Sequence, residues 1–277
     1  MNCDGHRPNR GLLSMKIRTI ITGMAGRMGR QVASALAHES DIQLVGGVDL
    51  KMQNITFGTG EAECRFKVTT DLPALMAKTH PNVLVDFTHP ASVMDNVRIA
   101  LENGVRCVVG TTGLSAVHFD EIRSLCQTNK IGAVVAPNFA IGAVLLMKFA
   151  EIASRHFASA EIIEMHHDKK VDAPSGTALK TAEFMRHSHP TAREEIAVSL
   201  ESQPARGEEV GVTRIHSVRL PGLVAHHEVI FGRPGETLTI RHDSLSRESF
   251  LPGVVIAVRE VMKLDHAVFG LDVLLDI

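Results

Sequence analysis

The densest group of titratable side chains lies in one short stretch, "EMHHDKKVDAPSGTA" (residues 164–178). Two histidines, an aspartate and two lysines lie together there, directly before a Pro-Ser-Gly-Thr turn. Histidine exchanges protons near neutral pH, and the turn residues are typical of a helix start, whose free N–H groups favour an anion. The stretch predicts a cationic pocket with a proton donor, suited to a small carboxylate substrate.

Within this stretch, His166 and Lys170 are placed so that they could face one pocket. If residues 160–167 form a strand, the side chains of His166 and His167 point to opposite faces. Beyond the strand the chain can curve, so that His166 and Lys170 share one pocket. Gly176 and Thr177 would then supply N–H groups at the helix start.

Two other interpretations of the same residues remain open. The stretch could be a charged surface loop without function, or half of a histidine-rich metal site with "AHHE" (residues 225–228) as its second half. Ammonium groups beside a cation are repelled, and no HExxH or similar ligand spacing occurs. We therefore expect no metal, and we expect "AHHE" to lie on a strand surface or at a subunit contact.

A glycine-rich segment, "IITGMAGRMGR", predicts a dinucleotide site near the N-terminus. Gly23, Gly26 and Gly29 follow a predicted strand and open a helix, where small residues let the backbone approach a pyrophosphate. Asp49 ends the next strand, at the place where an acid accepts hydrogen bonds from a ribose. A purely structural turn is the alternative. The loops "DFTHP", "GTTG" and "APNF" also follow predicted strands, at the sheet edge where ligands bind.

The elements that must position these residues alternate between strand and helix in the first half of the chain. Strands are predicted at 16–23, 42–49, 81–88, 105–112 and 131–139, and helices at 26–39, 72–79, 91–104 and 116–129. This rhythm predicts a mostly parallel sheet with helices on both faces, as in a Rossmann domain.

After about residue 138 the pattern changes to α+β. A helix is expected at 141–157 and strands at 160–167, 212–220, 225–232 and 236–244, with a helix again at 250–264. We predict a dinucleotide-binding domain of residues 15–138 and 250–277. Residues 139–249 would form a substrate-binding and oligomerisation domain with an open mixed sheet, and residues 1–14 a loose extension.

Composition excludes several classes of partner. The 277 residues carry a formal net charge of −2, with 44% hydrophobic and 22% charged residues, so nucleic acid and anionic membranes are not expected partners. No apolar run approaches the roughly 20 residues of a membrane helix. The four cysteines show no CxxC spacing, and the N-terminus lacks the apolar stretch of a signal peptide. We expect a cytoplasmic protein.

The run "EIIEMHHDKKVDAPSGTAL" resembles the signature of the dihydrodipicolinate reductase family of lysine and diaminopimelate biosynthesis. The segments "GMAGRMGR", "DFTHP", "VGTTG" and "APNFAIG" resemble the cofactor loops of that family, in the same order. The resemblance covers residues 15–277, and its HHxxKxDxPSGTA run is highly specific.

This resemblance implies an NAD(P)H-dependent enzyme that acts as a homotetramer built through the sheets of its second domain. Hydride would pass from the nicotinamide to the ring of a cyclic dicarboxylic acid, giving tetrahydrodipicolinate. His166 matches the acid/base histidine and Lys170 the proton donor of the family. The matching substrate contacts are His167, Gly176, Thr177 and Thr112. The matching cofactor positions are Gly23, Met24, Ala25, Gly26, Arg27, Met28, Asp49, Gly110, Thr111, Thr112, Ala136, Pro137, Asn138 and Phe139.

The chain departs from the family pattern after Asp49. Some members carry an arginine there that grips the 2′-phosphate of NADPH, whereas this chain has Leu50 and then Lys51. Asp49 disfavours a 2′-phosphate, and Arg27 and Lys51 could offset that repulsion. We expect both cofactors to work, with NADH at least competitive.

Two competing functions remain. The chain could be another dehydrogenase of similar plan that acts on an amino acid or a sugar, or a nucleotide sensor that has lost catalysis. The HHxxKxDxPSGT run argues against the first, and the intact His166/Lys170 pair against the second. A sensor would bind NADH without oxidising it.

Overall fold

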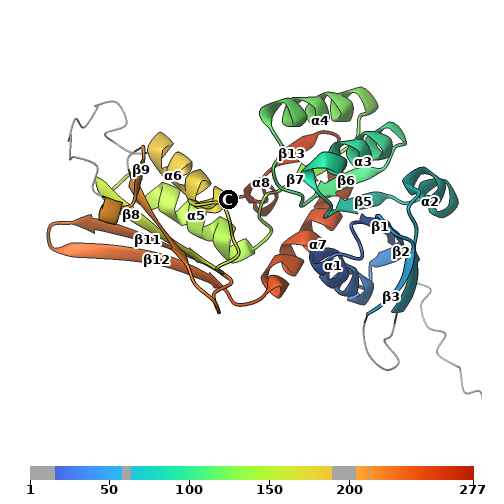
Figure 1. Cartoon of the computed structure of the whole chain (residues 1–277). Helices are drawn as coiled ribbons and strands as arrows, with labels where there is room; N and C mark the ends of the chain where they lie inside the picture. The colour runs from blue at the N-terminus through green and yellow to red at the C-terminus, as the bar shows by residue number, and fades with distance from the viewer. Residues whose placement is uncertain (1–15, 58–63, 189–203, 212) are drawn as a thin grey trace, which may run out of the picture.

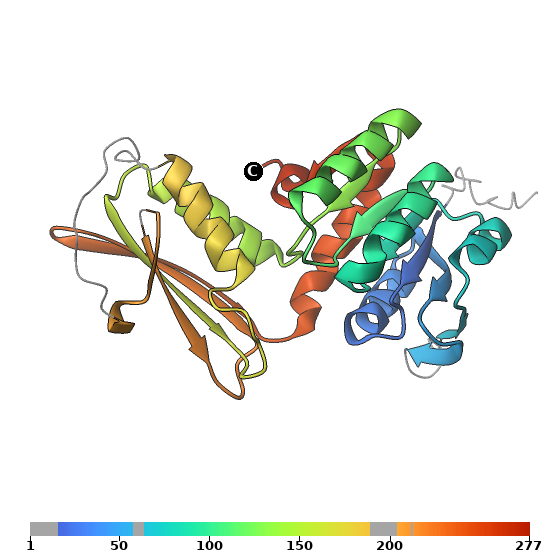
Figure 2. The ribbon, with the colours of Figure 1, turned by 45° about the horizontal axis from the view of Figure 1, so that its top comes forward.

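The computed structural model describes residues 16–57, 64–188, 204–211 and 213–277, which form two lobes joined by a short waist (Figure 1). Each lobe is built on its own β-sheet, and the same separation is visible after a 45° rotation (Figure 2). The predicted fold class, a parallel α/β unit followed by a mixed sheet, is confirmed.

The first lobe contains a six-stranded sheet in the order β13-β7-β6-β5-β1-β2, with every neighbouring pair parallel. Its strands are β1 (Ile17–Thr22), β2 (Ile42–Val48), β5 (Val83–Asp86), β6 (Arg106–Val109), β7 (Ala133–Val135) and β13 (Ala267–Phe269). The central strands β5 and β7 are buried along their whole length, which explains their largely apolar sequences.

Helices cover both faces of this sheet. Helices α1 (Arg27–His38) and α7 (Leu251–Glu260) pack on one face. On the other face lie α2 (Leu72–Thr79), α3 (Pro90–Glu102) and α4 (Ala116–Asn129). Because all six strands are parallel, their carboxyl ends and the loops that follow them lie along one edge of the sheet.

The C-terminal segment packs on the first lobe. Val254, Val258 and Val261 are fully or almost fully buried in the same core cluster as Val32 of α1. Arg259 also donates two hydrogen bonds to the carboxylate of Asp41, at 2.7 and 2.8 Å. After α7, β13 joins the sheet edge and a short helix, α8 (Asp272–Leu275), ends the chain.

The second lobe is a five-stranded mixed sheet in the order β12-β11-β8-β10-β9. Strands β8 and β10 are parallel, and the other pairs are antiparallel. Helices α5 and α6 pack on one face, where they bury Ile162, Val229 and Phe231. The bounds are α5 (Ile141–Ala153), β8 (Ser159–His166), α6 (Gly176–Ser188), β9 (Glu208–Val210), β10 (Thr213–Arg219), β11 (Ala225–Arg233) and β12 (Glu236–Ser244).

Several elements are absent from the sequence-based prediction. The hairpin of β3 (Gln53–Phe57) and β4 (Cys64–Val68) and the short strands β9 and β13 were missed, as was α8. Short 3-10 turns lie at Pro204–Arg206, Arg247–Phe250 and Val261–Lys263. Within the described ranges, no helix is both long and apolar enough to cross a membrane. The predicted loose extension, residues 1–14, lies outside the described residues.

The expectation for "AHHE", a strand surface or a subunit contact, does not hold for His227 as a surface residue, because His227 is 5% exposed and lies on the helix-covered face of β11. Strand alternation explains this, because His227 shares its face with the buried Val229 and Phe231. The subunit contact stays a prediction.

Candidate active site

The glycine loop between β1 and α1 is shaped for close backbone approach. Gly23 has φ +76°, in the left-handed region that favours glycine, and a Cβ there would meet the carbonyl group of Phe87. A Cβ on Gly29 would collide with the carbonyl oxygen of Gly23. The loop thus folds tightly over the start of α1, whose first N–H groups have no acceptor within the helix.

A cavity of about 630 Å³ lies against this loop. Its walls come from the carboxyl ends of β1, β2 and β5, so it occupies the sheet edge predicted to bind the cofactor. Its lining residues include Thr22, Gly23, Ala25, Gly26, Asp49, Phe87, Thr88 and His89. Asp49 faces the loop directly, because its Oδ2 accepts a hydrogen bond of 2.9 Å from the Ala25 N–H.

Asp86, at the end of β5, links the loops of this edge. It is fully buried and accepts hydrogen bonds from the Thr22 hydroxyl (2.7 Å) and the Thr111 hydroxyl (2.6 Å). Thr88 donates to it through both its N–H and its hydroxyl, and Asn96 of α3 through its side-chain amide at 2.8 Å. One carboxylate therefore fixes the glycine loop, "DFTHP" and "GTTG" relative to one another.

The other predicted cofactor residues line the same edge only in part. The Met24 side chain is fully buried and packs so closely on Gly47 that a Cβ there would collide with its sulfur atom. Only the backbone of Met24 could therefore contact a cofactor. Gly110 lies under the Phe87 ring, and Phe87 packs against Phe139 with ring centroids 6.0 Å apart. Arg27 and Met28 occupy the first turn of α1, and Ala136 is buried at the end of β7. Thr112 and Pro137 are exposed.

The titratable stretch forms a strand end followed by a turn. Strand β8 ends at His166, and His167 begins a turn in which its carbonyl accepts a hydrogen bond from the Lys170 N–H at 3.1 Å. The strand ends one residue earlier than predicted, so strand alternation does not govern His167. Its Nδ1 is buried and has no hydrogen-bond partner among the described residues. Lys170 Nζ donates to both carboxylate oxygens of Asp172, at 2.7 and 2.8 Å.

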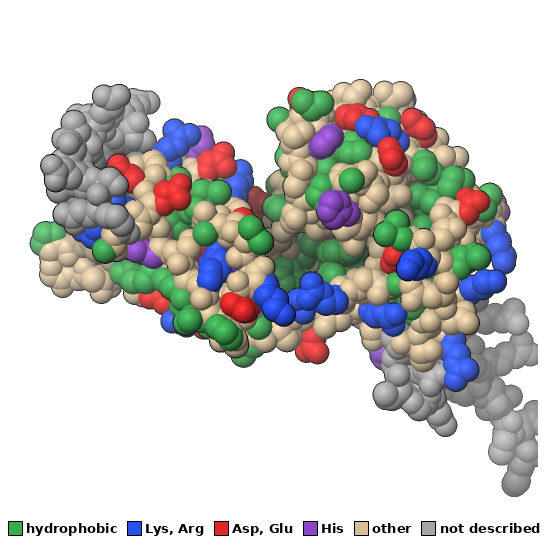
Figure 3. All heavy atoms as spheres, in the orientation of Figure 1, with side chains coloured by type: hydrophobic (Ala, Val, Ile, Leu, Met, Phe, Trp, Pro, Cys, Tyr) green, Lys and Arg blue, Asp and Glu red, His purple; other side chains and the backbone are tan. Residues whose placement is uncertain are grey.

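Helix α6 begins beside this turn, at Gly176. The Ser175 hydroxyl accepts a hydrogen bond of 3.3 Å from the Ala178 N–H, in the manner of an N-cap. At the same place, Asn138 Nδ2 donates to the Thr177 hydroxyl at 3.3 Å. This contact joins the "APNF" loop to the helix start, so predicted cofactor and substrate residues meet at one point. In the space-filling view the surface is hollowed between the two lobes, with basic side chains near the hollow (Figure 3).

Two residues of this site, Glu164 and Arg219, were missed by the sequence-based reasoning. Glu164 is fully buried, two residues before His166 on the same face of β8. Its Oε2 lies 2.5 Å from His166 Nδ1, and Arg219 donates to both carboxylate oxygens, at 2.7 and 2.9 Å. Burial would raise the pKa of Glu164, but hydrogen bonds from His166 and Arg219 outweigh it and hold the pKa at about 2. A glutamate at an apolar position of the strand pattern was the signal that could have identified Glu164 as a buried, paired carboxylate.

Both halves of the chain match models of one family. Residues 17–139 match the N-terminal part of dihydrodipicolinate reductase, and residues 142–275 match its C-terminal part. The chain belongs to the dihydrodipicolinate reductase family.

Individual members of the family align with nearly the whole chain. A 4-hydroxy-tetrahydrodipicolinate reductase from Moorella thermoacetica is 48% identical over 267 residues, covering 94% of this chain and 98% of the relative. The enzyme of the same name from Syntrophomonas wolfei is 43% identical and is covered completely, with 95% of this chain aligned. Among solved structures, dipicolinate-bound dihydrodipicolinate reductase from Paenisporosarcina sp. TG-14 has a TM-score of 0.79 and 39% identity. That alignment covers 93% of this chain and 99% of the solved one.

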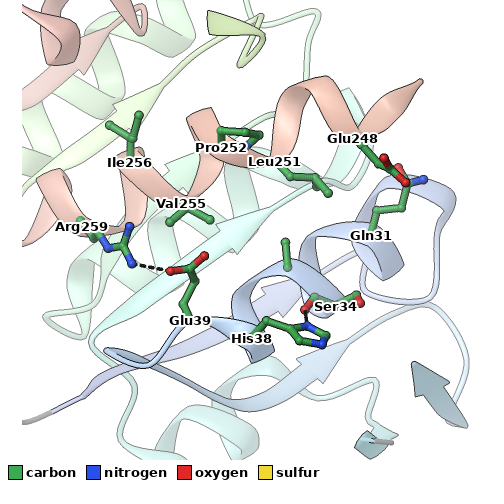
Figure 4. Close-up of a pocket in the computed structure, with 11 residues that line it drawn as sticks. Gln31, Ser34, His38, Glu39, Glu248, Leu251, Pro252, Val255, Ile256 and Arg259 are labelled. Carbon is green, nitrogen blue, oxygen red and sulfur yellow. Dashed lines mark hydrogen bonds and ion pairs between the residues drawn. The ribbon is translucent and has the colours of Figure 1, made fainter. Parts of the chain in front are cut away.

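The glycine-loop cavity fits the dinucleotide that the reductase family uses. The cavity has a tight glycine turn, a helix N-terminus for the pyrophosphate and the Asp49 carboxylate within the same wall. A separate cavity of about 710 Å³ lies between α1 and α7, beside the ion pair of Arg259 and Glu39 (Figure 4). None of the predicted site residues lines that cavity.

Proposed function

We propose that the chain is a 4-hydroxy-tetrahydrodipicolinate reductase, which reduces its substrate to tetrahydrodipicolinate with NAD(P)H. The step belongs to lysine and diaminopimelate biosynthesis, and the family membership supports it. The single structural observation that carries the proposal is the Asn138–Thr177 hydrogen bond. It brings the carboxyl edge of the parallel sheet to the helix start beside His166 and Lys170, so that a cofactor and a small acid would meet there.

Each end of the site has a distinct task in this proposal. The bound reduced nicotinamide would supply the hydride. Gly23 to Met28 would hold the pyrophosphate, and Asp49 the adenosine ribose. The N–H groups of Gly176 and Thr177 would bind one substrate carboxylate, with His167 and Thr112 as further contacts. Preorganised positive groups of this kind stabilise developing negative charge.

Proton transfer is assigned to His166 and Lys170. Loss of the 4-hydroxyl group of the substrate as water gives a conjugated imine. Hydride addition to that imine leaves an enamine-like anion, which a nearby acid must protonate. The Nε2 of His166 is the available ring nitrogen, because Nδ1 is bonded to Glu164. Lys170 Nζ, held by Asp172, is the second donor at the same turn.

Three finer proposals accompany this function. We propose that both NADH and NADPH support turnover, that the chain forms a homotetramer through the outer face of its second sheet, and that it works in the cytoplasm. We also propose the domain division 15–138 with 250–277 and 139–249. That outer face carries the ion pairs of Arg241 with Glu228 and Asp243, which support a polar subunit contact.

The activity is tested by following the absorbance of reduced nicotinamide while substrate is made in place from pyruvate and aspartate semialdehyde by the preceding synthase. We expect rapid oxidation that requires every component. Cofactor binding without oxidation would favour a sensor instead.

Parallel reactions with NADH and NADPH rank the cofactors, and a strong preference for NADPH would contradict the specificity proposal. Sedimentation of the purified chain measures its oligomeric state.

A further inference from the structure

The reductase site contains a buried ion pair to which no role has been assigned so far. Glu164 has no exposed surface, and Arg219 lies directly opposite His166 on the neighbouring parallel strand. The two hydrogen bonds between them, at 2.7 and 2.9 Å, form a bidentate pair. Removing either partner would leave a buried charge without its counter-charge, which is strongly destabilising. The intact pair itself contributes little net stability, because both charges have lost their hydration. A specific role in the site would explain why the pair is there.

Three separate pieces of the site converge on this pair. His166 is bonded to Glu164 Oε2 at 2.5 Å. The Ser175 N–H, at the start of α6, donates to Glu164 Oε1 at 3.2 Å. Arg219 donates to the Asp172 carbonyl at 2.6 Å, and Asp172 in turn holds Lys170. The proton-transfer groups and the anion-binding helix start are therefore fixed to one carboxylate and one guanidinium.

The charge of Glu164 also determines the tautomer of His166. An ionised carboxylate has no proton to give, so a hydrogen bond with His166 Nδ1 requires the proton to lie on that nitrogen. The low pKa of Glu164, about 2, keeps it ionised throughout the working range. Nε2 is then left to exchange a proton with substrate. Other titratable groups around Glu164 are Arg219 from β10 and His227 from β11, which stands opposite it in register.

We propose that Glu164 and Arg219 are the positioning residues of the reductase site, which fix the His166 tautomer and tie the Lys170 turn and the α6 start to strand β8. This inference rests on the proposed function for the role of His166. It differs from that function in having a readout that does not need turnover, namely the protonation pattern of the His166 ring.

The decisive variant is Glu164→Gln, which keeps the size of the side chain and removes its charge. We expect kcat to fall about 100-fold, because a misplaced proton donor costs roughly that much. KM for NADH should stay within about twofold of the parent value, as Glu164 lies outside the glycine-loop cavity. The pH profile of kcat/KM should also change, because the imidazole loses the carboxylate that fixes its tautomer.

Arg219→Lys supplies a second test that survives a folding failure of the first variant. It keeps the positive charge but loses the planar fork that reaches Glu164 and the Asp172 carbonyl together. We expect affinity for dipicolinate, measured by calorimetry, to fall about tenfold, since the anion-binding elements lose their common anchor. Asp41→Asn is the matched control, because Asp41 forms a bidentate pair with Arg259 away from this site. It should leave the pH profile and dipicolinate affinity unchanged.

Nitrogen NMR of the histidine rings separates the inference from the function on which it rests. The chain has 15 histidines, so the His166 signals are assigned by comparison with His166→Gln. We expect the Nδ1–H tautomer in the parent protein and a mixture in Glu164→Gln. If the parent fails to oxidise NADH but shows the fixed tautomer, the function is wrong and the positioning role stands. Normal turnover together with an unchanged kcat, pH profile and tautomer in Glu164→Gln would overturn the positioning role.

Discussion

Two fully buried carboxylates, Asp86 and Glu164, organise this molecule in different ways. Asp86 lies at the carboxyl edge of the parallel sheet, the proposed cofactor edge. Glu164 lies beside the His166–Lys170 turn, the proposed substrate end. The donors to Asp86 among the described residues are hydroxyls, an amide and a backbone N–H, all of them neutral. Glu164 is instead bonded to a guanidinium and an imidazole. The cofactor edge thus has an anchor whose partners do not titrate. The substrate end has an ionic anchor coupled to a group that exchanges protons.

The largest effect should come from the substrate end. Lys170→Ala removes the proposed proton donor, and we expect kcat to fall by about 10² to 10⁴, the usual contribution of a positioned acid or base. NADH affinity should stay near the parent value, because Lys170 is not among the residues that line the glycine-loop cavity. Steady-state turnover and an NADH titration measure the two quantities. Lys169→Ala, which changes an exposed neighbour, is the control. An equal loss of cofactor affinity would mean that the two ends are not separate.

The ionic character of the substrate end also predicts a pH dependence of stability. His227, opposite Glu164, is buried, and burial lowers its pKa from 6.5 to about 4 in spite of the attraction of Glu164. As the pH falls below 6.5 the unfolded chain gains a proton that the folded chain refuses until about pH 4. The folded state therefore loses stability across that window, by about 3 kcal/mol for one such group.

Glu164 contributes in a lower window. Its folded pKa of about 2 lies below the ordinary value of 4.5, so its stabilisation is complete above pH 4.5 and is lost as the pH falls toward 2. Urea unfolding between pH 7 and pH 5 should show the effect of the buried histidines, because burial lowers the pKa of His242 as well as that of His227. His227→Leu should flatten the curve in this range, and His266→Leu, at an exposed position, should not. An unchanged slope in His227→Leu would show that another group titrates there.

At the cofactor edge, Asp86→Asn should have an intermediate effect. The amide keeps one oxygen as acceptor but turns an NH₂ group toward the donors of Thr88 or Asn96, and a buried donor left unpaired costs about 1–3 kcal/mol. We expect a lower unfolding free energy and NADH binding weakened about tenfold, with an unshifted pH profile of turnover. Asp95→Asn on the exposed side of α3 is the control. A shift in the pH profile would remove the distinction between the two anchors.

The difference between these anchors also explains what the sequence could predict. Burial on both faces of the sheet requires apolar strands that alternate with amphipathic helices. This pattern is visible in the sequence, so the parallel sheet could be predicted, together with the sheet edge at which its loops lie. His166, Lys170 and the glycine loop could be proposed from the sequence because chemistry sets their residue types and spacing. The short strands β9 and β13 lack enough residues for a periodic pattern, and β13 becomes a strand only because β7 is beside it.

The partners of the anchors were harder to predict, because they are distant in sequence. Arg219 meets Glu164 only through the parallel pairing of β8 and β10, a register that no local pattern specifies. Thr22 and Thr111 meet at Asp86 for the same reason. The burial of His227 was not predicted, because a shift of one residue in strand register exchanges the buried face and the exposed face.

The smallest effect is expected where the two ends touch. Thr177→Ala removes the hydroxyl that accepts the Asn138 hydrogen bond of 3.3 Å, but the backbone N–H that would bind a substrate carboxylate survives. A single neutral hydrogen bond contributes about 0.5–1.5 kcal/mol, so we expect KM for substrate to rise only severalfold and kcat to change little. Thr177→Ser, which restores the hydroxyl, should return KM to the parent value. A loss in Thr177→Ala as large as that in Lys170→Ala would mean that this contact, rather than the two buried carboxylates, holds the ends in register.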